Sequence, residues 1–190
     1  MKNKDFILAS SSPQRLALLK QIGYTPKKIK PSDIDETTLK GETPCMYVKR
    51  MALEKALKCA KENPKQNILA GDTIVAVGNR ILHKAQNAEE QTKVMQLLSG
   101  RSSRVISAVC LIDKTGKIMK RCVESRVITK HMNEEEIACY VASNEWQGCC
   151  GFKIEGCFAG YVRKIIGSYS SIVGLPLFEV QNLLKGIGIK

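Results

Sequence analysis

One carboxylate with no obvious structural role, Asp72, stands inside the apolar stretch of residues 68–77. Residues 68–70 predict a buried strand that ends at this aspartate, and a second apolar run follows it as far as a turn at Gly78-Asn79. A carboxylate among apolar residues is costly to bury unless it has a partner. Asp72 is therefore either a structural residue that caps or pairs with a neighbour, or a metal ligand or catalytic group.

A hydroxyl-rich turn near the N-terminus is a candidate anion site. Residues 6–9 predict a short strand, Ser10-Ser11-Ser12 a polar turn, and residues 13–22 a helix that Gly23 ends. The free N–H groups of a helix N-terminus attract anions, and Arg15 adds a positive charge in the first turn. Alternatively, the turn merely caps the helix and the arginine is a surface charge.

An acidic loop and a basic helix follow. The loop of residues 32–38 carries Asp33, Asp35 and Glu36, and carboxylate oxygens are the ligands that divalent cations such as Mg²⁺ prefer. Such a loop is also typical of a solvated surface. The next helix, predicted over residues 43–63, carries Lys55 beside its apolar stripe, where a lysine alone would be an ordinary solvated charge.

The remaining elements alternate, which indicates a mixed α/β chain without internal repeats or a clear domain boundary. At 190 residues, it is expected to form one domain, residues 1–190, with a core of its own. We expect further strands at 24–30, 80–82, 105–112, 117–129 and 162–166, helices at 87–98, 133–142 and 176–184, a turn at 167–171, and a loop at 148–160 that lines a site.

The charge balance alone does not identify a partner. Thirty basic residues against 18 acidic ones give a net charge of +12, which would suit nucleic acid or a small polyanionic substrate. Single-stranded nucleic acid is usually held by aromatic side chains among the basic ones, and aromatic residues make up 5% of this chain. We therefore expect no specific nucleic-acid partner.

The sequence predicts a cytoplasmic protein with no membrane partner. No apolar run approaches the roughly 20 residues of a membrane span, and the short apolar block after the first residues is not that of a signal peptide. The eight cysteines never form a Cys-x-x-Cys pair, so reduced thiols are expected. The neighbours Cys149 and Cys150 are expected to be small packing residues rather than a redox pair.

A set of sequence blocks that nearly spans the chain resembles the Maf family of nucleoside triphosphate pyrophosphatases. Any one block is weak evidence, but together and in this order they are specific. They are LASSSPQR (residues 8–15), Asp35-Glu36, RMALEKA (50–56), GDTIV (71–75), LSGR (98–101), GFKIEG (151–156), GSY (167–169) and VGLPL (173–177).

The resemblance implies an α/β fold of two lobes, similar to that of inosine triphosphatases, with a central, strongly twisted mixed sheet flanked by helices and a cleft between the lobes. It further implies a homodimer and an Mg²⁺- or Mn²⁺-dependent hydrolase that converts a nucleoside triphosphate into the monophosphate and pyrophosphate. In the cell, this activity would keep modified nucleotides from being incorporated. The alternative is a protein of this fold that acts in cell division by binding, because the family is linked to division arrest.

The resemblance also assigns residues. Asp72 and Glu36 would hold the metal and orient or deprotonate the water, and either role of Asp72 stays open. Ser10, Arg15, Lys55 and Lys84 would bind the phosphates. The glycine and lysine spacing of a P-loop is missing around Asp72, which argues against a motor or switch NTPase.

Substrate choice in this family resembles a code of three positions, which here are Gln14, Thr73 and Glu155. The branch that prefers dTTP and UTP has Arg, Thr and Gln there, and the branch that prefers 7-methyl-GTP has Trp, Gln and Glu. Gln14 matches neither branch, Thr73 the first and Glu155 the second. A glutamate accepts from the N–H edge of guanine but faces the O4 acceptor of uracil less well. We therefore expect a broad or purine-tolerant specificity.

Overall fold

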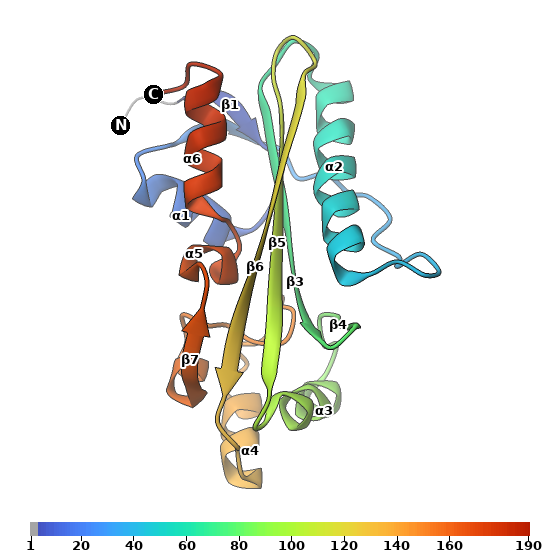
Figure 1. Ribbon diagram of the computed structural model, residues 1–190, viewed down its shortest axis with the longest axis vertical. Helices are drawn as coiled ribbons and strands as arrows, with labels where there is room; N and C mark the ends of the chain where they lie inside the picture. Colours follow the sequence, from blue (N-terminus) through green and yellow to red (C-terminus); the bar gives the residue numbers. More distant parts are fainter. Residues whose placement is uncertain (1–3) are drawn as a thin grey trace.

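A computed structural model of the chain describes residues 4–190, in which a long twisted sheet has helices on both faces (Figure 1). Two long strands, β5 and β6, run through the length of the molecule. The elements are β1 (Lys4–Leu8), α1 (Pro13–Gln21), β2 (Pro26–Ile29), α2 (Pro44–Glu62), β3 (Ile68–Val77), β4 (Arg80–Leu82), α3 (Ala88–Leu98), β5 (Ser102–Ile112), β6 (Ile118–Thr129), α4 (Glu134–Ala142), the 3₁₀ helix η1 (Cys157–Tyr161), β7 (Val162–Ile166), α5 (Tyr169–Val173) and α6 (Leu177–Gly186).

The sheet is mixed, as expected. Its strands follow the order β2-β1-β3-β5-β6-β7, and β4 pairs separately with β3. β1 is parallel to both β2 and β3, whereas the pairs β3–β5, β5–β6 and β6–β7 are antiparallel. The hairpin of β5 and β6 is paired from Ser102 opposite Ile128 to Ile112 opposite Ile118. These two strands connect the two ends of the molecule.

Asp72 lies in the middle of a strand, and the prediction that the strand ends at this residue is wrong. β3 is continuous because one of its edges pairs with β5 over nine residues, with Asp72 opposite Ala108. On the opposite edge of β3, β1 pairs with Ile68 and Leu69, and β4 pairs only from Val75 onward. Among the described strands, none covers the edge between these two contacts. The structure therefore leaves room for side chains and a ligand beside Asp72.

Helices pack on both faces of one end of the sheet. On one face, the apolar stripe of α2 packs on β3 and β5; on the other, residues of α1 and α6 form a second cluster with β1, β3 and β5. A third cluster, at the other end, joins α3, α4 and the segment that follows α4. None of the helices within residues 4–190 is long and apolar enough to cross a membrane.

Most predicted elements are present, and besides the continuity of β3 three differences occur. The expected loop of residues 148–160 ends in the 3₁₀ helix η1. The expected turn at residues 167–171 is in fact largely the short helix α5, because Ser168 caps it by accepting a hydrogen bond from the Ser171 N–H at 3.3 Å. β5 begins at Ser102 rather than at residue 105. The hydroxyl of the fully buried Ser103 donates to the Val127 carbonyl, so a polar residue extends the strand without an unpaired buried group.

Candidate functional site

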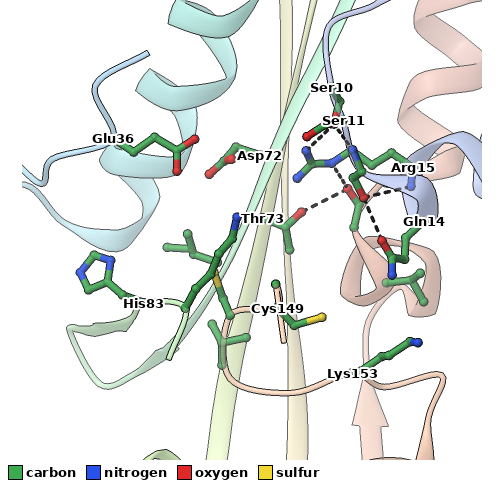
Figure 2. A pocket seen from close by; sticks show the side chains of 18 of the residues that line it. Ser10, Ser11, Gln14, Arg15, Glu36, Asp72, Thr73, His83, Cys149 and Lys153 are labelled. Atoms are coloured by element: carbon green, nitrogen blue, oxygen red, sulfur yellow. Dashed lines mark hydrogen bonds between the residues drawn. The ribbon is translucent and has the colours of Figure 1, made fainter. Parts of the chain in front are cut away.

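A cavity of about 660 Å³ opens beside the uncovered edge of β3. It lies between the hydroxyl-rich turn of residues 10–12, the acidic loop of residues 32–38, α2 and the loop of residues 147–155 (Figure 2). Residues from seven separate segments of the chain meet there. All nine residues that the sequence analysis singled out line it: Ser10, Gln14, Arg15, Glu36, Lys55, Asp72, Thr73, Lys84 and Glu155.

Lys55 holds two carboxylates in this cavity. Its ammonium nitrogen lies 2.6 Å from an Asp72 oxygen and 2.7 Å from a Glu36 oxygen. The side chains of Lys55 and Asp72 are each 12% exposed, so little water screens their attraction. Lys55 is thus no ordinary solvated charge, and Asp72 does have a partner, which accounts for its burial.

Glu36 is the one carboxylate of the acidic loop that reaches the cavity. The hydroxyl of Tyr47, a buried residue of α2, donates to the Glu36 carbonyl at 2.9 Å and so ties the loop to the helix. Asp35 instead accepts from the Thr37 N–H at 2.8 Å and stabilises the loop itself. Asp33 and Asp35 are exposed, as the solvated interpretation of the loop predicts.

The contact with Lys55 should make stability depend on pH. Burial raises the pKa of Glu36, but the hydrogen bond and charge of Lys55, with the charges of Lys84 and Arg15, outweigh it and bring the pKa below its ordinary value of 4.5. A depressed carboxyl pKa stabilises the fold above the unfolded-state pKa, and this contribution is lost as the pH falls through the folded-state pKa.

We therefore expect Glu36→Gln to lower the free energy of unfolding at pH 7 and to have less effect as the pH falls below about 4.5. Urea unfolding of wild type and variant from pH 7 to pH 3.5 measures this difference. An unchanged difference across that range would mean that the Glu36–Lys55 contact does not stabilise the fold. Glu134→Gln, in an exposed residue of α4, is the matched control.

The hydroxyl-rich turn and Arg15 form one unit. The Arg15 guanidinium donates to the Ser10 hydroxyl and to the Gly174 carbonyl, both at 3.0 Å, and these contacts fix its direction (Figure 2). Ser12 caps α1 by accepting from the Arg15 N–H at 3.4 Å. Burial lowers the pKa of Arg15 and the nearby Asp72 opposes this shift, yet an arginine remains charged at neutral pH. The turn thus caps a helix, as the alternative interpretation had it, but Arg15 faces the cavity and is not a surface charge.

Thr73 and Gln14 stand at the same wall. The Thr73 hydroxyl lies 2.7 Å from that of Ser107 and also donates to the Gly174 carbonyl at 3.2 Å. The Gln14 side-chain oxygen accepts from the Ser12 hydroxyl at 3.2 Å, which leaves its amide N–H groups for other partners. The two side chains are therefore oriented by their neighbours before any ligand binds.

The loop of residues 147–155 forms another wall of the cavity, as the sequence analysis expected of a loop at residues 148–160. It is tied to the exposed Lys84 by a backbone bridge between Lys84 and Cys150. Burial raises the pKa of the Cys149 thiol, and raises that of Cys150 to about 11, so both thiols are protonated at neutral pH. All eight cysteines are free in the described chain, and protonated thiols are poor redox groups.

Sequence reasoning missed two basic residues of the cavity, His83 and Lys153 (Figure 2). His83 precedes Lys84, and Lys153 lies within the GFKIEG block, so the signal was present in segments already singled out. Neither residue type is unusual at a protein surface, and nothing in the local pattern separates a lysine in a cavity from a solvated one.

The carboxylates are too few for a metal site made by the protein alone. Among residues 4–190, no group of three or more His, Cys, Asp or Glu side chains is placed to hold a metal ion. Asp72 and Glu36 nevertheless converge on one positive charge, the Lys55 ammonium. Mg²⁺ is commonly bound by one or two carboxylates together with substrate phosphates and water, so this pair fits a cation that arrives with a phosphate substrate.

Comparisons with known proteins agree with this geometry. The family model described as Maf-like protein matches residues 5–187. A dTTP/UTP pyrophosphatase of Mesorhizobium japonicum is 47% identical over 191 residues, which cover 97% of this chain and 92% of the relative. One from Paramagnetospirillum magneticum is 48% identical over 183 residues, 96% of each chain. The solved structure of a HAM1 protein from Coxiella burnetii has a TM-score of 0.54 at 16% identity, over 95% of this chain and 98% of the other, which shows a shared fold.

Proposed function

Since this chain belongs to the Maf family, we propose that it is a nucleoside triphosphate pyrophosphatase that hydrolyses the bond between the α and β phosphates. One observation carries the proposal: Lys55 joins Asp72 and Glu36 in the same cavity as the Ser10–Arg15 turn. Paired carboxylates facing an anion site are what hydrolysis of a polyphosphate requires. We further propose that residues 1–190 act as a single catalytic domain.

Charge neutralisation is the first task of the site. A triphosphate brings several negative charges, and Arg15 and Lys84 line the cavity without a carboxylate partner among the described residues. Arg15 is held by the Ser10 hydroxyl and the Gly174 carbonyl, so its free N–H groups are oriented before the substrate arrives. Such prior orientation lowers the cost of stabilising charge in the transition state.

Activation of water is the second task. In the proposed site, Asp72 accepts a hydrogen bond or the proton from the attacking water, and the contact with Lys55 fixes the orientation of the Asp72 carboxylate. Asp72 and Glu36 would also hold Mg²⁺ or Mn²⁺. When bound, the cation neutralises phosphate charge and makes a nearby water more acidic. The water oxygen forms a bond to the α phosphorus and gives the monophosphate, the anhydride bond between the α and β phosphates breaks, and pyrophosphate leaves with the electron pair of that bond.

The relatives' names favour dTTP and UTP as the first substrates to test. Two relatives with this name match at least 96% of the chain at 47% and 48% identity. The prediction of purine tolerance rests on Gln14 and Glu155 and stays a prediction; both residues line the cavity. Pyrimidine specificity and purine tolerance predict different results for GTP and ITP. A pyrimidine-specific enzyme would leave these two nucleotides unchanged, and a purine-tolerant enzyme would hydrolyse them.

A nucleotide panel tests the proposal. With Mg²⁺ or Mn²⁺, wild-type protein is expected to release pyrophosphate from dTTP and UTP with a kcat/KM of about 10⁴ M⁻¹ s⁻¹ or more, as is usual for an enzyme on its own substrate. Chelation with EDTA should abolish the release. If neither these nucleotides nor GTP, ITP, CTP, ATP and 7-methyl-GTP yield pyrophosphate, the proposed function is wrong.

We also propose that the protein acts in the cytoplasm as a homodimer. Eight free cysteines suit a reducing compartment. Tyr169 and Phe178 are 51% and 74% exposed near the N-terminal ends of α5 and α6, and exposed aromatic residues are common in interfaces between subunits. Light scattering with size-exclusion chromatography would give about twice the chain mass of 21.0 kDa for a dimer.

A further inference from the structure

Lys153 is a cation of the cavity that has no part in the proposed charge neutralisation or water activation. It is half-buried and lines the cavity, and within residues 4–190 it makes no ion pair. Lys55, by contrast, is bound by two carboxylates. In Figure 2, Lys153 lies on the side of Thr73 away from Glu36, together with Gln14. A lysine that faces a cavity without a protein partner is available to a ligand.

The backbone around Lys153 is fixed. Its N–H donates to the Tyr140 hydroxyl at 3.0 Å, and Tyr140 is fully buried, with its ring centroid 5.3 Å from that of Phe158. Phe152 stacks on Phe158 at 4.4 Å. One residue before Phe152, the carbonyl of Gly151 accepts from the buried Gln91 amide at 2.8 Å. The backbone at Lys153, from which the side chain extends, is thus held in place by the core.

Lys153 and Glu155 alternate with core residues. Phe152 and Ile154 are 6% and 4% exposed, whereas Lys153 is half-buried and Glu155 exposed, and both of the latter line the cavity. The Cys149 thiol is close enough to respond to both charges. Burial raises its pKa most, the Glu155 carboxylate raises it further, and the Lys153 ammonium lowers it. A cation and an anion therefore stand together at this wall.

These two groups complement one kind of base edge. An ammonium group can only donate hydrogen bonds and a carboxylate can only accept them. Uracil, thymine, guanine and hypoxanthine present a ring carbonyl beside a ring N–H, which needs one donor and one acceptor. Cytosine and adenine present the reverse, an amino group beside a ring nitrogen that accepts. With the lysine at the carbonyl and the glutamate at the ring N–H, the pair matches a keto base, whereas an amino base needs the two groups in exchanged positions. The relatives' names, dTTP/UTP pyrophosphatase, favour the first order.

We propose that Lys153 is a specificity residue that donates to the carbonyl oxygen of a keto base while Glu155 accepts the neighbouring ring N–H. The inference rests on the proposed function and names its substrate class, the keto-base nucleoside triphosphates. Lys153 supplies the donor to uracil O4 that Glu155 cannot, so the presence of a glutamate at position 155 does not exclude dTTP and UTP. A keto purine shares the same edge, and whether it fits is decided by the test.

The test compares wild type with Lys153→Met, which keeps the length of the side chain and removes its charge. We expect the variant to lose about 10- to 100-fold in kcat/KM for UTP and dTTP, the size of one charged hydrogen bond, chiefly through a higher KM. For CTP the change should stay within about threefold. GTP and ITP test whether keto purines are also substrates. If Lys153→Met lowers kcat/KM for GTP and ITP as it does for UTP, the substrate class includes keto purines. If wild-type protein does not hydrolyse GTP and ITP, the class is limited to keto pyrimidines.

Binding provides a readout that does not require turnover. Titration calorimetry with the α,β-methylene analogues of UTP and CTP should give a weaker Kd for the UTP analogue in Lys153→Met and an unchanged Kd for the CTP analogue. Lys164→Met, in an exposed residue of β7, is the matched control and should leave both unchanged.

Two results would overturn the inference and leave the proposed function intact. One is an equal loss, or no loss, on keto and amino nucleotides in an Lys153→Met protein that keeps the wild-type melting temperature. The other is a wild-type preference for CTP or ATP over UTP. Absence of pyrophosphate release from every nucleotide with wild-type protein would instead refute the proposed function, and the inference with it.

Discussion

Asp72→Asn is expected to lower kcat for pyrophosphate release by about 10³-fold or more, which is within the range of a group that takes or orients a proton in the transition state. Asparagine keeps the shape of the side chain but can neither accept a proton at neutral pH nor hold a metal as a carboxylate does. Steady-state release of pyrophosphate from UTP, coupled to a pyrophosphatase and phosphate detection, measures the loss.

Nucleotide binding separates this expectation from a mere loss of folding. The Asp72→Asn protein should still bind the α,β-methylene analogue of UTP, because Arg15, Lys84 and the Ser10 turn are intact. Asp33→Asn, in the exposed part of the acidic loop, is the control and should retain full activity. Activity of Asp72→Asn within about tenfold of wild type would contradict a catalytic role. A cellular effect on division that survives this substitution would favour the binding protein over the enzyme as its cause.

Lys55→Met is expected to reduce both activity and stability. The substitution leaves the Asp72 side chain, which is 12% exposed, near a second carboxylate and without its cationic partner. Removal of one partner of a buried ion pair costs about 3–5 kcal/mol, and the partial exposure of Glu36 places this case near the lower end. Urea unfolding at pH 7 should show a loss of about 3 kcal/mol.

The activity of Lys55→Met should fall by about 10²-fold, since misplacement of a catalytic group by an ångström has an effect of this size. Lys58→Met provides the matched control one turn further along α2: Lys58 is exposed, and its ammonium donates to the Asp33 carbonyl outside the cavity. It should change neither activity nor unfolding free energy appreciably. A Lys55→Met protein as stable as wild type would show that the two carboxylates do not depend on this lysine.

The order of strands and helices was predictable because the local signals were strong. Thr43 before Pro44 marks the start of α2, and its hydroxyl caps the helix by accepting from the Met46 N–H at 3.3 Å. The capping box at Asn133 and Glu136 likewise marks α4. The composition of the cavity was also anticipated, but through the resemblance to a family: all nine predicted residues line it, and no spacing rule would have joined Glu36 to Glu155.

What the sequence could not provide depends on contacts between distant segments. The continuity of β3 through Asp72 comes from its pairing with β5, more than thirty residues away, whereas the local pattern suggests a strand that stops. The ion pairs of Lys55 require α2, β3 and the acidic loop to meet, so on the helix alone this lysine resembles any surface charge. Lys153 becomes distinct from a solvated lysine only when Tyr140 fixes the backbone beside it.

The most direct test of the central claim is the identity of the products from UTP. Wild-type protein with Mg²⁺ is incubated with UTP, and the products are separated by anion-exchange chromatography and identified by ³¹P NMR. The proposed function predicts UMP and pyrophosphate in equal amounts, with neither UDP nor phosphate as an early product. The appearance of UDP and phosphate, or the recovery of every nucleotide of the panel unchanged, would contradict it.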